Sequence, residues 1–251
     1  MKKYLLAAAL LTLLIGIPGQ ALAAGRTNVQ TTATAGSEVR MNNLKERANQ
    51  EIDRRVSALN GLITKINNMK KLSAVQKASF TGKINEQISD LIALKSKIDG
   101  DTDPQTLISD VKSIVDSYRI YVLFMPQIDI LDAADRISVI NDQMSTLAGK
   151  LASRIDEAQK DGKDVSALLA QLKDMQAKTQ DAQAQATAAT AEVIGLDPSG
   201  YPGNRGALET GRSDVKAGRD DVFASIKDAE SIISGLKALN TGTATTPTTT
   251  G

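Results

Sequence analysis

Apolar side chains recur every three or four residues through most of the chain, and no other feature limits its fold as strongly. This spacing follows the helical turn of about 3.6 residues, so the apolar residues of each segment fall on one helix face. The chain has no cysteine, so helix packing rather than disulfide bonds must supply its stability. The sequence therefore predicts an all-α protein that is held together along apolar seams.

Breaks in this period divide the chain into separate helices. Ser73 with Gln76 forms a capping-box pattern, and Asp103 followed by Pro104 is typical of a helix start. Pro126 should kink or break its helix, because proline removes a backbone donor and clashes with the preceding turn. The five expected helices cover residues 37–71, 73–98, 104–160, 165–193 and 207–239.

The last two expected helices carry complementary small residues. The fourth helix has a strict heptad-type seam, and the fifth carries Gly211 and Gly218 on its inward face. Glycine costs about 1 kcal/mol relative to alanine inside a helix, so these two glycines suggest close packing against an antiparallel neighbour. The fourth seam consists of Val165, Leu168, Leu172, Met175, Thr179, Ala182, Ala186, Ala189 and Val193. The fifth has Leu208, Val215, Val222, Ile226, Ile233 and Leu236 inward.

Short connections between long helices favour an elongated antiparallel bundle. Residues 37–125 should form a first three-helix bundle and residues 126–240 a second, which share the long kinked third helix. This layout resembles that of spectrin-like repeats, although no sequence motif of those repeats is present. At a rise of 1.5 Å per residue, the helices should be roughly 40–80 Å long.

The first 23 residues have the features of a cleaved signal peptide. Lys2 and Lys3 precede an apolar run of 14 residues, and a small-x-small cleavage site ends at Ala23. A membrane-spanning helix needs about 20 apolar residues, so we expect cleavage after Ala23 or Ala24 rather than a membrane anchor. The mature protein should be exported to the periplasm, the cell surface or the medium, with no integral membrane segment.

Both ends of the mature chain are polar and lack helical periodicity. Residues 24–36 should form a flexible tether. Residues 241–251 contain seven threonines and should be disordered.

The composition excludes several classes of function. The chain has no histidine and no cysteine, so it cannot form Ser–His–Asp or Cys–His catalytic sites or zinc sites with those ligands. Loss of residues 1–23 leaves 28 basic and 29 acidic residues, which alternate along the chain without a basic block. Nucleic acid is therefore not an expected partner. We expect no catalytic residues, no cofactor and no enzymatic activity.

Asp99, Asp101, Asp103 and Asp110 have spacings that partly match a calcium-binding loop. An EF-hand loop requires glycine at its sixth position, where this chain has Pro104. A capped turn explains the same acids, so calcium is not expected.

The segment from Tyr118 to Leu131 is the most unusual part of the mature chain, because its apolar residues cover more than one helix face. It is interpreted as a buried bundle junction or, alternatively, as an interaction patch beside Pro126. A polar network of Arg119, Asp129, Asp132, Asp135 and Arg136 would then lie beside it. The candidate interaction residues are Tyr118, Arg119, Tyr121, Phe124, Asp132, Asp135 and Arg136.

Two long phrases resemble sequences of an uncharacterised group of exported all-helical proteins from small-genome bacteria. They are SYRIYVLFMPQIDILDAADRI at residues 117–137 and SDVKAGRDDVFASIKDAESIISGLK at residues 213–237. The resemblance extends over nearly the whole mature chain and implies an exported helical protein, but no activity.

These features favour a non-enzymatic helical protein that serves as a scaffold, spacer or protein-binding module of the cell envelope. Its partner would be another protein or a second copy that associates along the helix faces. The alternatives are a periplasmic chaperone or carrier of hydrophobic ligands, an envelope hydrolase that uses carboxylates such as Asp132 and Asp135, and a helical pore-former.

Overall fold

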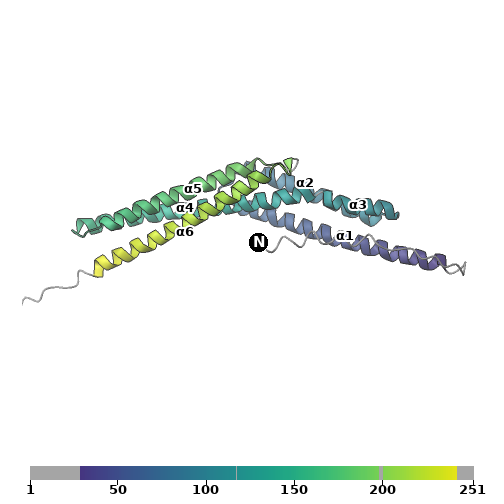
Figure 1. Ribbon diagram of the computed structural model, residues 1–251, viewed down its shortest axis with the longest axis horizontal. Helices are drawn as coiled ribbons and strands as arrows, with labels where there is room; N and C mark the ends of the chain where they lie inside the picture. The colour runs from purple at the N-terminus through teal and green to yellow at the C-terminus, as the bar shows by residue number, and fades with distance from the viewer. Residues whose placement is uncertain (1–28, 117, 198–199, 242–251) are drawn as a thin grey trace, which may run out of the picture. The chain divides into compact units, whose positions relative to one another are not determined.

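The structure, a computed structural model, describes residues 29–116, 118–197 and 200–241 (Figure 1). This part of the chain contains α-helices and no strand, which confirms the predicted all-α class. None of the described helices is long and apolar enough to cross a lipid bilayer. The helices are α1 (Val29–Asn68), α2 (Ala74–Gly100), α3 (Pro104–Asp116), α4 (Tyr118–Lys160), α5 (Ser166–Ile194) and α6 (Arg205–Thr241).

From Lys45 onward, α1 packs against α2 and α3. Lys95 of α2 pairs with Asp53 of α1 at 2.6 Å, and the buried Arg55 of α1 donates a hydrogen bond to the carbonyl oxygen of Ile114 in α3. The capping box predicted at Ser73 and Gln76 is present at the start of α2. Fully buried apolar side chains come from all three helices: Ile52 and Ile66 of α1, Ile84 and Ile98 of α2, and Leu107 of α3.

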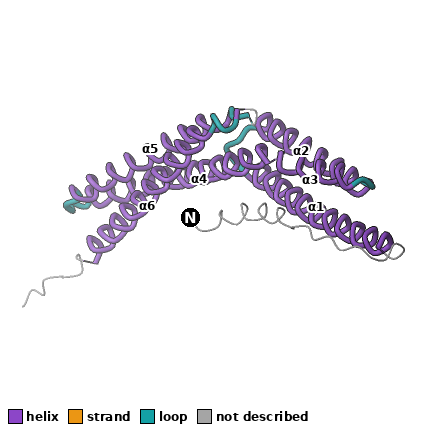
Figure 2. Tube along the Cα trace, turned by 45° about the vertical axis from the view of Figure 1, so that its right-hand side comes forward, coloured by secondary structure: helices purple, strands orange, loops and turns teal. Residues whose placement is uncertain are grey.

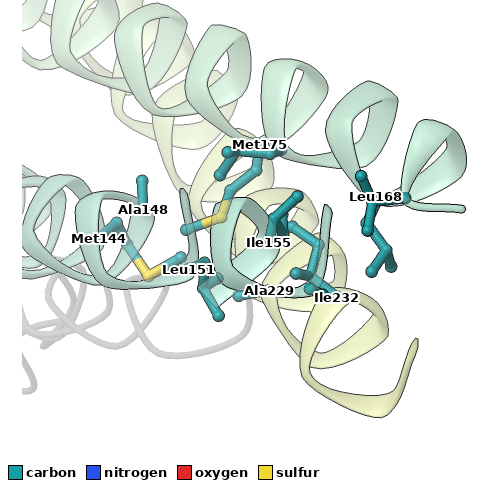
Figure 3. Close-up of a cluster of buried hydrophobic side chains, with 11 residues drawn as sticks. Met144, Ala148, Leu151, Ile155, Leu168, Met175, Ala229 and Ile232 are labelled. Carbon is teal, nitrogen blue, oxygen red and sulfur yellow. The ribbon is translucent and has the colours of Figure 1, made fainter. Parts of the chain in front are cut away.

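A second three-helix bundle consists of α4, α5 and α6, which pack pairwise. Figure 3 shows its core near the α4–α5 turn, where side chains of all three helices meet. Met175 and Ile232 are fully buried there, beside Ile155. Apolar burial of this kind contributes about 25 cal/mol for each Å² removed from water, so this seam holds the bundle together.

The predicted seam of α5 is confirmed at every position, because all nine residues from Val165 to Val193 are buried. The predicted seam of α6 is partly wrong. Ile233 is 36 % exposed, whereas its neighbour Ile232 is fully buried. The buried positions continue the heptad through small residues, Ser225 and Ala229, which an apolar pattern does not register.

A glycine follows the end of α4, in the turn between α4 and α5. Gly162 has φ +78°, a left-handed conformation that glycine adopts without steric cost. The N–H of Lys163 then donates to the carbonyl oxygen of Ala158 at 3.1 Å, and the ammonium of Lys163 donates to Oδ1 of Asn240 at 2.9 Å. The end of α6 therefore lies beside this turn. The turns between α1 and α2, between α2 and α3, and between α4 and α5 each span three to five residues and are drawn as loops in Figure 2.

Three predicted boundaries need correction. Residues 29–36 are helical rather than a flexible tether, because they contain no proline and Gly36 alone does not end a helix. The expected third helix is present as α3 and α4, with residue 117 outside the described part. Pro126 lies inside α4 and does not break it. The predicted signal peptide and residues 242–251 of the threonine-rich tail also lie outside the described residues.

The helices α5 and α6 approach closely at two glycines. A Cβ atom on Gly211 would lie 2.9 Å from Cγ1 of Val193, and one on Gly218 would lie 3.2 Å from the carbonyl oxygen of Ala182. The structure brings these glycines to the buried faces of Ala182, Ala186 and Ala189. The backbone of α5 therefore lies where a side chain at position 218 would have to fit.

The substitution Gly218→Leu should lower the free energy of unfolding by about 1–3 kcal/mol, because the leucine side chain would overfill the α5–α6 contact. Urea unfolding followed by far-UV circular dichroism measures the change. The matched control is Gly149→Leu on α4, where no atom lies within 4 Å of the added Cβ. This control should leave stability unchanged or raise it by up to about 1 kcal/mol through helix propensity. Equal effects of the two substitutions would contradict the close contact.

Candidate functional site

The predicted interaction residues lie in the first half of α4, but the described ones do not form one surface. The side chains of Tyr118, Arg119 and Tyr121 are outside the described part. Phe124 is only 2 % exposed, and Leu123 beside it is fully buried. Phe124 therefore belongs to the packed interior.

The predicted polar network is replaced by separate contacts. Asp135 is 8 % exposed, and its carboxylate accepts hydrogen bonds from the backbone N–H of Lys70 at 2.9 Å and of Lys71 at 2.5 Å. Asp132 pairs with the exposed Arg136 at 2.9 Å on the same helix. Asp135 thus anchors the turn between α1 and α2 to α4, which is a structural role.

Asp129, the third acid of the predicted network, pairs with Lys65 of α1 at 2.5 Å. This contact joins α1 to α4 six residues before Asp135. Asp129 and Asp135 therefore hold α1 and its following turn against α4, and the described residues place no shared reactive pair there.

Gln127 is a buried polar residue that the sequence analysis did not select. It is fully buried in α4, and its Nε2 donates to the carbonyl oxygens of Val193 at 2.6 Å and Leu196 at 3.3 Å. These carbonyls lie at the end of α5, where helical partners run out. Gln127 therefore caps α5 from the neighbouring helix.

The acids near the α2–α3 turn are also structural. Asp103 accepts from the backbone N–H of Thr106 at 2.8 Å, and this bond lowers the pKa of Asp103. Asp110 pairs with Lys97 at 2.8 Å, which raises the pKa of Lys97. Burial, followed by the nearby Asp110 carboxylate, raises the pKa of Asp101. In the described part of the chain, no three His, Cys, Asp or Glu residues are placed to hold a metal ion.

A groove of about 710 Å³ lies between α4 and α5, and Lys71 of the α1–α2 turn and Gln76 of α2 also line it. We call it the α4–α5 groove. Nine of its fourteen lining residues are polar and uncharged, although most of the surface that they expose to the groove is apolar. Its two charged residues, Lys71 and Asp142, pair with each other at 2.5 Å. The other lining residues are Gln76, Ser138, Asn141 and Ser145, and from α5 Thr179, Gln180, Gln183, Ala186, Thr187, Thr190, Ala191 and Ile194.

Hydrogen bonds within the protein occupy several donors of this groove. The hydroxyls of Thr187 and Thr190 each donate at 2.9 Å to the carbonyl oxygen four residues earlier. Nε2 of Gln183 donates to Oγ of Ser138 at 3.2 Å. Lone pairs on the hydroxyl oxygens stay available as acceptors.

Asn141 is a buried lining residue of the α4–α5 groove whose amide is unpaired. Its side chain is 3 % exposed, yet neither Oδ1 nor Nδ2 has a hydrogen-bond partner in the structure. An unpaired buried polar group costs about 1–3 kcal/mol. Both atoms are covered by neighbouring protein atoms, so this amide lies beneath the surface of the groove rather than open to it.

A heptad count would have found Asn141. The buried positions of α4 include Ile137, Met144, Ala148 and Leu151, and Asn141 continues their alternation of three and four. A pattern of apolar residues alone selects the neighbouring Ile140 for this seam instead of Asn141.

Comparisons with protein-family models, with curated proteins and with solved structures found no match to this chain. The α4–α5 groove is therefore interpreted from its own chemistry. It offers hydrogen-bond groups and a floor of small side chains, without a nucleophile paired to a base among its lining residues.

Replacement of Asp135 by alanine should lower the free energy of unfolding by about 2–5 kcal/mol, because two backbone N–H groups would lose a charged acceptor. Chemical denaturation measures this loss. Asp132→Ala is the control and should cost less than about 1 kcal/mol, since it removes an ion pair to an exposed arginine. A small effect at Asp135 would contradict its anchoring role.

Asp101 should make stability depend on pH. Its pKa is higher in the folded than in the unfolded chain, so folding favours the protonated carboxyl. The stabilisation from this proton is present at acid pH and is lost as the pH rises through the folded pKa. We therefore expect Asp101→Asn to raise the melting temperature near neutral pH and to change it little in acid.

Thermal unfolding of wild type and Asp101→Asn across the acid-to-neutral range measures this difference. Asp99→Asn is a control at an exposed acid two residues away. A difference between wild type and Asp101→Asn that grows toward acid would be opposite to the expectation.

Proposed function

We propose that this protein is an exported, non-enzymatic helical module that binds another protein in the cell envelope and serves there as a scaffold. The α4–α5 groove carries this proposal, because its lining mixes hydrogen-bonding side chains with apolar surface and includes no nucleophile paired to a base. Such a surface suits recognition through hydrogen bonds rather than bond-breaking chemistry.

The proposed location depends on the first 23 residues. Their basic start, apolar run and Ala-Leu-Ala cleavage site are typical of a secretory signal peptide. The absence of histidine and cysteine supports a binding role, because it removes the usual bases and nucleophiles.

A photo-crosslinking experiment in the producing cells tests the proposal. A photoreactive amino acid replaces the exposed Gln180 at the rim of the α4–α5 groove, and the matched control replaces the exposed Asn60 of α1. We expect one protein partner to be cross-linked at position 180 and not at position 60, in the envelope fraction. The purified protein should begin at Ala24 or Gly25 by intact mass.

Two results would overturn this function. One is recovery of the full-length chain, with its first 23 residues, from the cytoplasm. The other is the same cross-linked products at positions 180 and 60, which would mean that the α4–α5 groove has no role in partner choice.

A further inference from the structure

Helix α6 separates its acids from its bases. Asp214, Asp221 and Asp228 are spaced by seven residues, so they share one side of the helix. This side borders α5, because Asp228 pairs with Lys178 of α5 at 2.8 Å. Arg212 and Arg219 each precede one of these acids by two residues, which places them about 160° around the helix. These bases therefore lie on the flank of α6 that is turned away from α5.

Apolar side chains continue this flank toward the end of α6. Ile226 and Ile233 follow Arg219 at seven-residue spacing, in the same row. Ile226 is partly buried against the core of the bundle, whereas Ile233 is 36 % exposed. The row that begins with two bases thus ends with two isoleucines.

Helix α4 contributes a second apolar row beside the first. Its buried Ile137 faces α6, because a Cβ atom on Gly218 would lie 3.4 Å from Cδ1 of Ile137. Ile140 and Leu147 lie about 60–80° around α4 from Ile137, on the side opposite to the residues that line the α4–α5 groove. Both are partly buried against the core. The α4–α6 face is the strip formed by Ile140, Leu147, Ile226 and Ile233, together with Phe223.

Phe223 is the most exposed aromatic side chain of this strip. It is 57 % exposed, whereas the two other phenylalanines of the chain, Phe80 and Phe124, are buried. Burial of an exposed aromatic ring and of its aliphatic neighbours favours association with an apolar phase.

Unpaired bases border the α4–α6 face. The structure gives no ion pair to five exposed bases of its described part: Lys150 of α4 and Arg212, Arg219, Lys227 and Lys237 of α6. Arg136, Arg154 and Lys216 also lie along this face, but each pairs with an acid of its own helix. Glu230 is the exposed acid without an ion pair among the described residues there. The face therefore combines apolar side chains with a net positive charge.

We propose that the α4–α6 face docks on the surface of a lipid membrane with anionic headgroups, where Phe223 and Ile233 enter the boundary between headgroups and acyl chains. Apolar burial and attraction between bases and anionic lipid act together at such surfaces. The described helices cannot span a bilayer, and this docking does not require one to do so. The inference concerns a different surface from the α4–α5 groove and does not depend on the proposed protein partner.

A lipid surface suits this face better than an acidic protein does. The unpaired bases of α6 extend from Arg212 to Lys237, which corresponds to about 38 Å of helix. An acidic protein would have to hold its carboxylates in register over that length. An anionic bilayer presents headgroups at every point of its surface, so no register is required. Acidic polypeptide therefore enters the test as the competing class.

The first measurement is sedimentation of the mature chain, residues 24–251, with lipid vesicles. The first 23 residues are left out because their apolar run would itself bind lipid. We expect binding at least about tenfold tighter to vesicles of equal parts phosphatidylglycerol and phosphatidylcholine than to phosphatidylcholine alone. Salt at about 1 M should remove this preference, because it screens the charges.

The second measurement places a tryptophan on the α4–α6 face. The chain has no tryptophan, so Phe223→Trp introduces a single fluorophore at an exposed position. Its emission should move to shorter wavelength when anionic vesicles are added, because the ring leaves water. The matched control is Leu169→Trp on α5, which is 45 % exposed in the wild type and should show no shift.

Arg219→Glu should weaken binding to the anionic vesicles by about tenfold, because it removes one attractive charge and adds a repulsive one. Lys173→Glu, at an exposed position of α5, changes the net charge equally and should leave the affinity within about twofold of wild type. Both positions are exposed, so both variants should unfold like the wild type in urea.

Three results would overturn the inference: the chain does not sediment with anionic vesicles, the two tryptophan variants shift equally, or Arg219→Glu binds as tightly as Lys173→Glu. A shift of the Phe223→Trp variant with polyglutamate but not with vesicles would assign the face to an acidic polypeptide and reject the membrane. Cross-linking at position 180 reports only on the α4–α5 groove, so the proposed function and this inference can fail separately.

Discussion

The contact between α5 and α6 depends on side chains that are too small to hold the two helices apart. Gly211 and Gly218 on α6 face the alanine-rich half of α5, and a Cβ atom at either glycine would meet neighbouring atoms at 2.9–3.2 Å. Larger side chains, such as Leu168 and Met175, fill the other half of the seam. In one part of the bundle, large aliphatic side chains pack between the helices. In the other part, the backbones of α5 and α6 pack directly against each other.

The sequence predicted the fold class and the α5 seam because both follow from one period. Every α5 seam residue was identified, since its heptad includes large residues that mark the phase. The α6 seam was partly missed where Ser225 and Ala229 replace large residues. Pro126 was expected to disturb its helix, but packing around Phe124 and Gln127 keeps that part of α4 helical. Tertiary contacts of this kind are not visible in a local pattern.

The candidate site was the least predictable part. Side chains that lie far apart in sequence form it, and the contacts of Asp135 with Lys70 and Lys71 join residues more than sixty positions apart. The sequence marked Asp135 as one of several acids near an apolar segment, without its partners. Asn141 carried a signal, a polar residue in a heptad position, but its unpaired state depends on how α4 and α5 meet.

Because Asp135 anchors the α1–α2 turn, α4 must make two separate sets of packing contacts along its length. Its carboxylate at position 135 must face this turn, while Met144 and Leu151 must face the core with α5 and α6. Each added residue rotates a helix by about 100°, so a single insertion between these positions would satisfy one contact and misdirect the other. Seven added residues would nearly restore the phase. Insertions that nearly keep the helical phase, such as seven or eleven residues, should therefore disturb these two contacts less than a single insertion does.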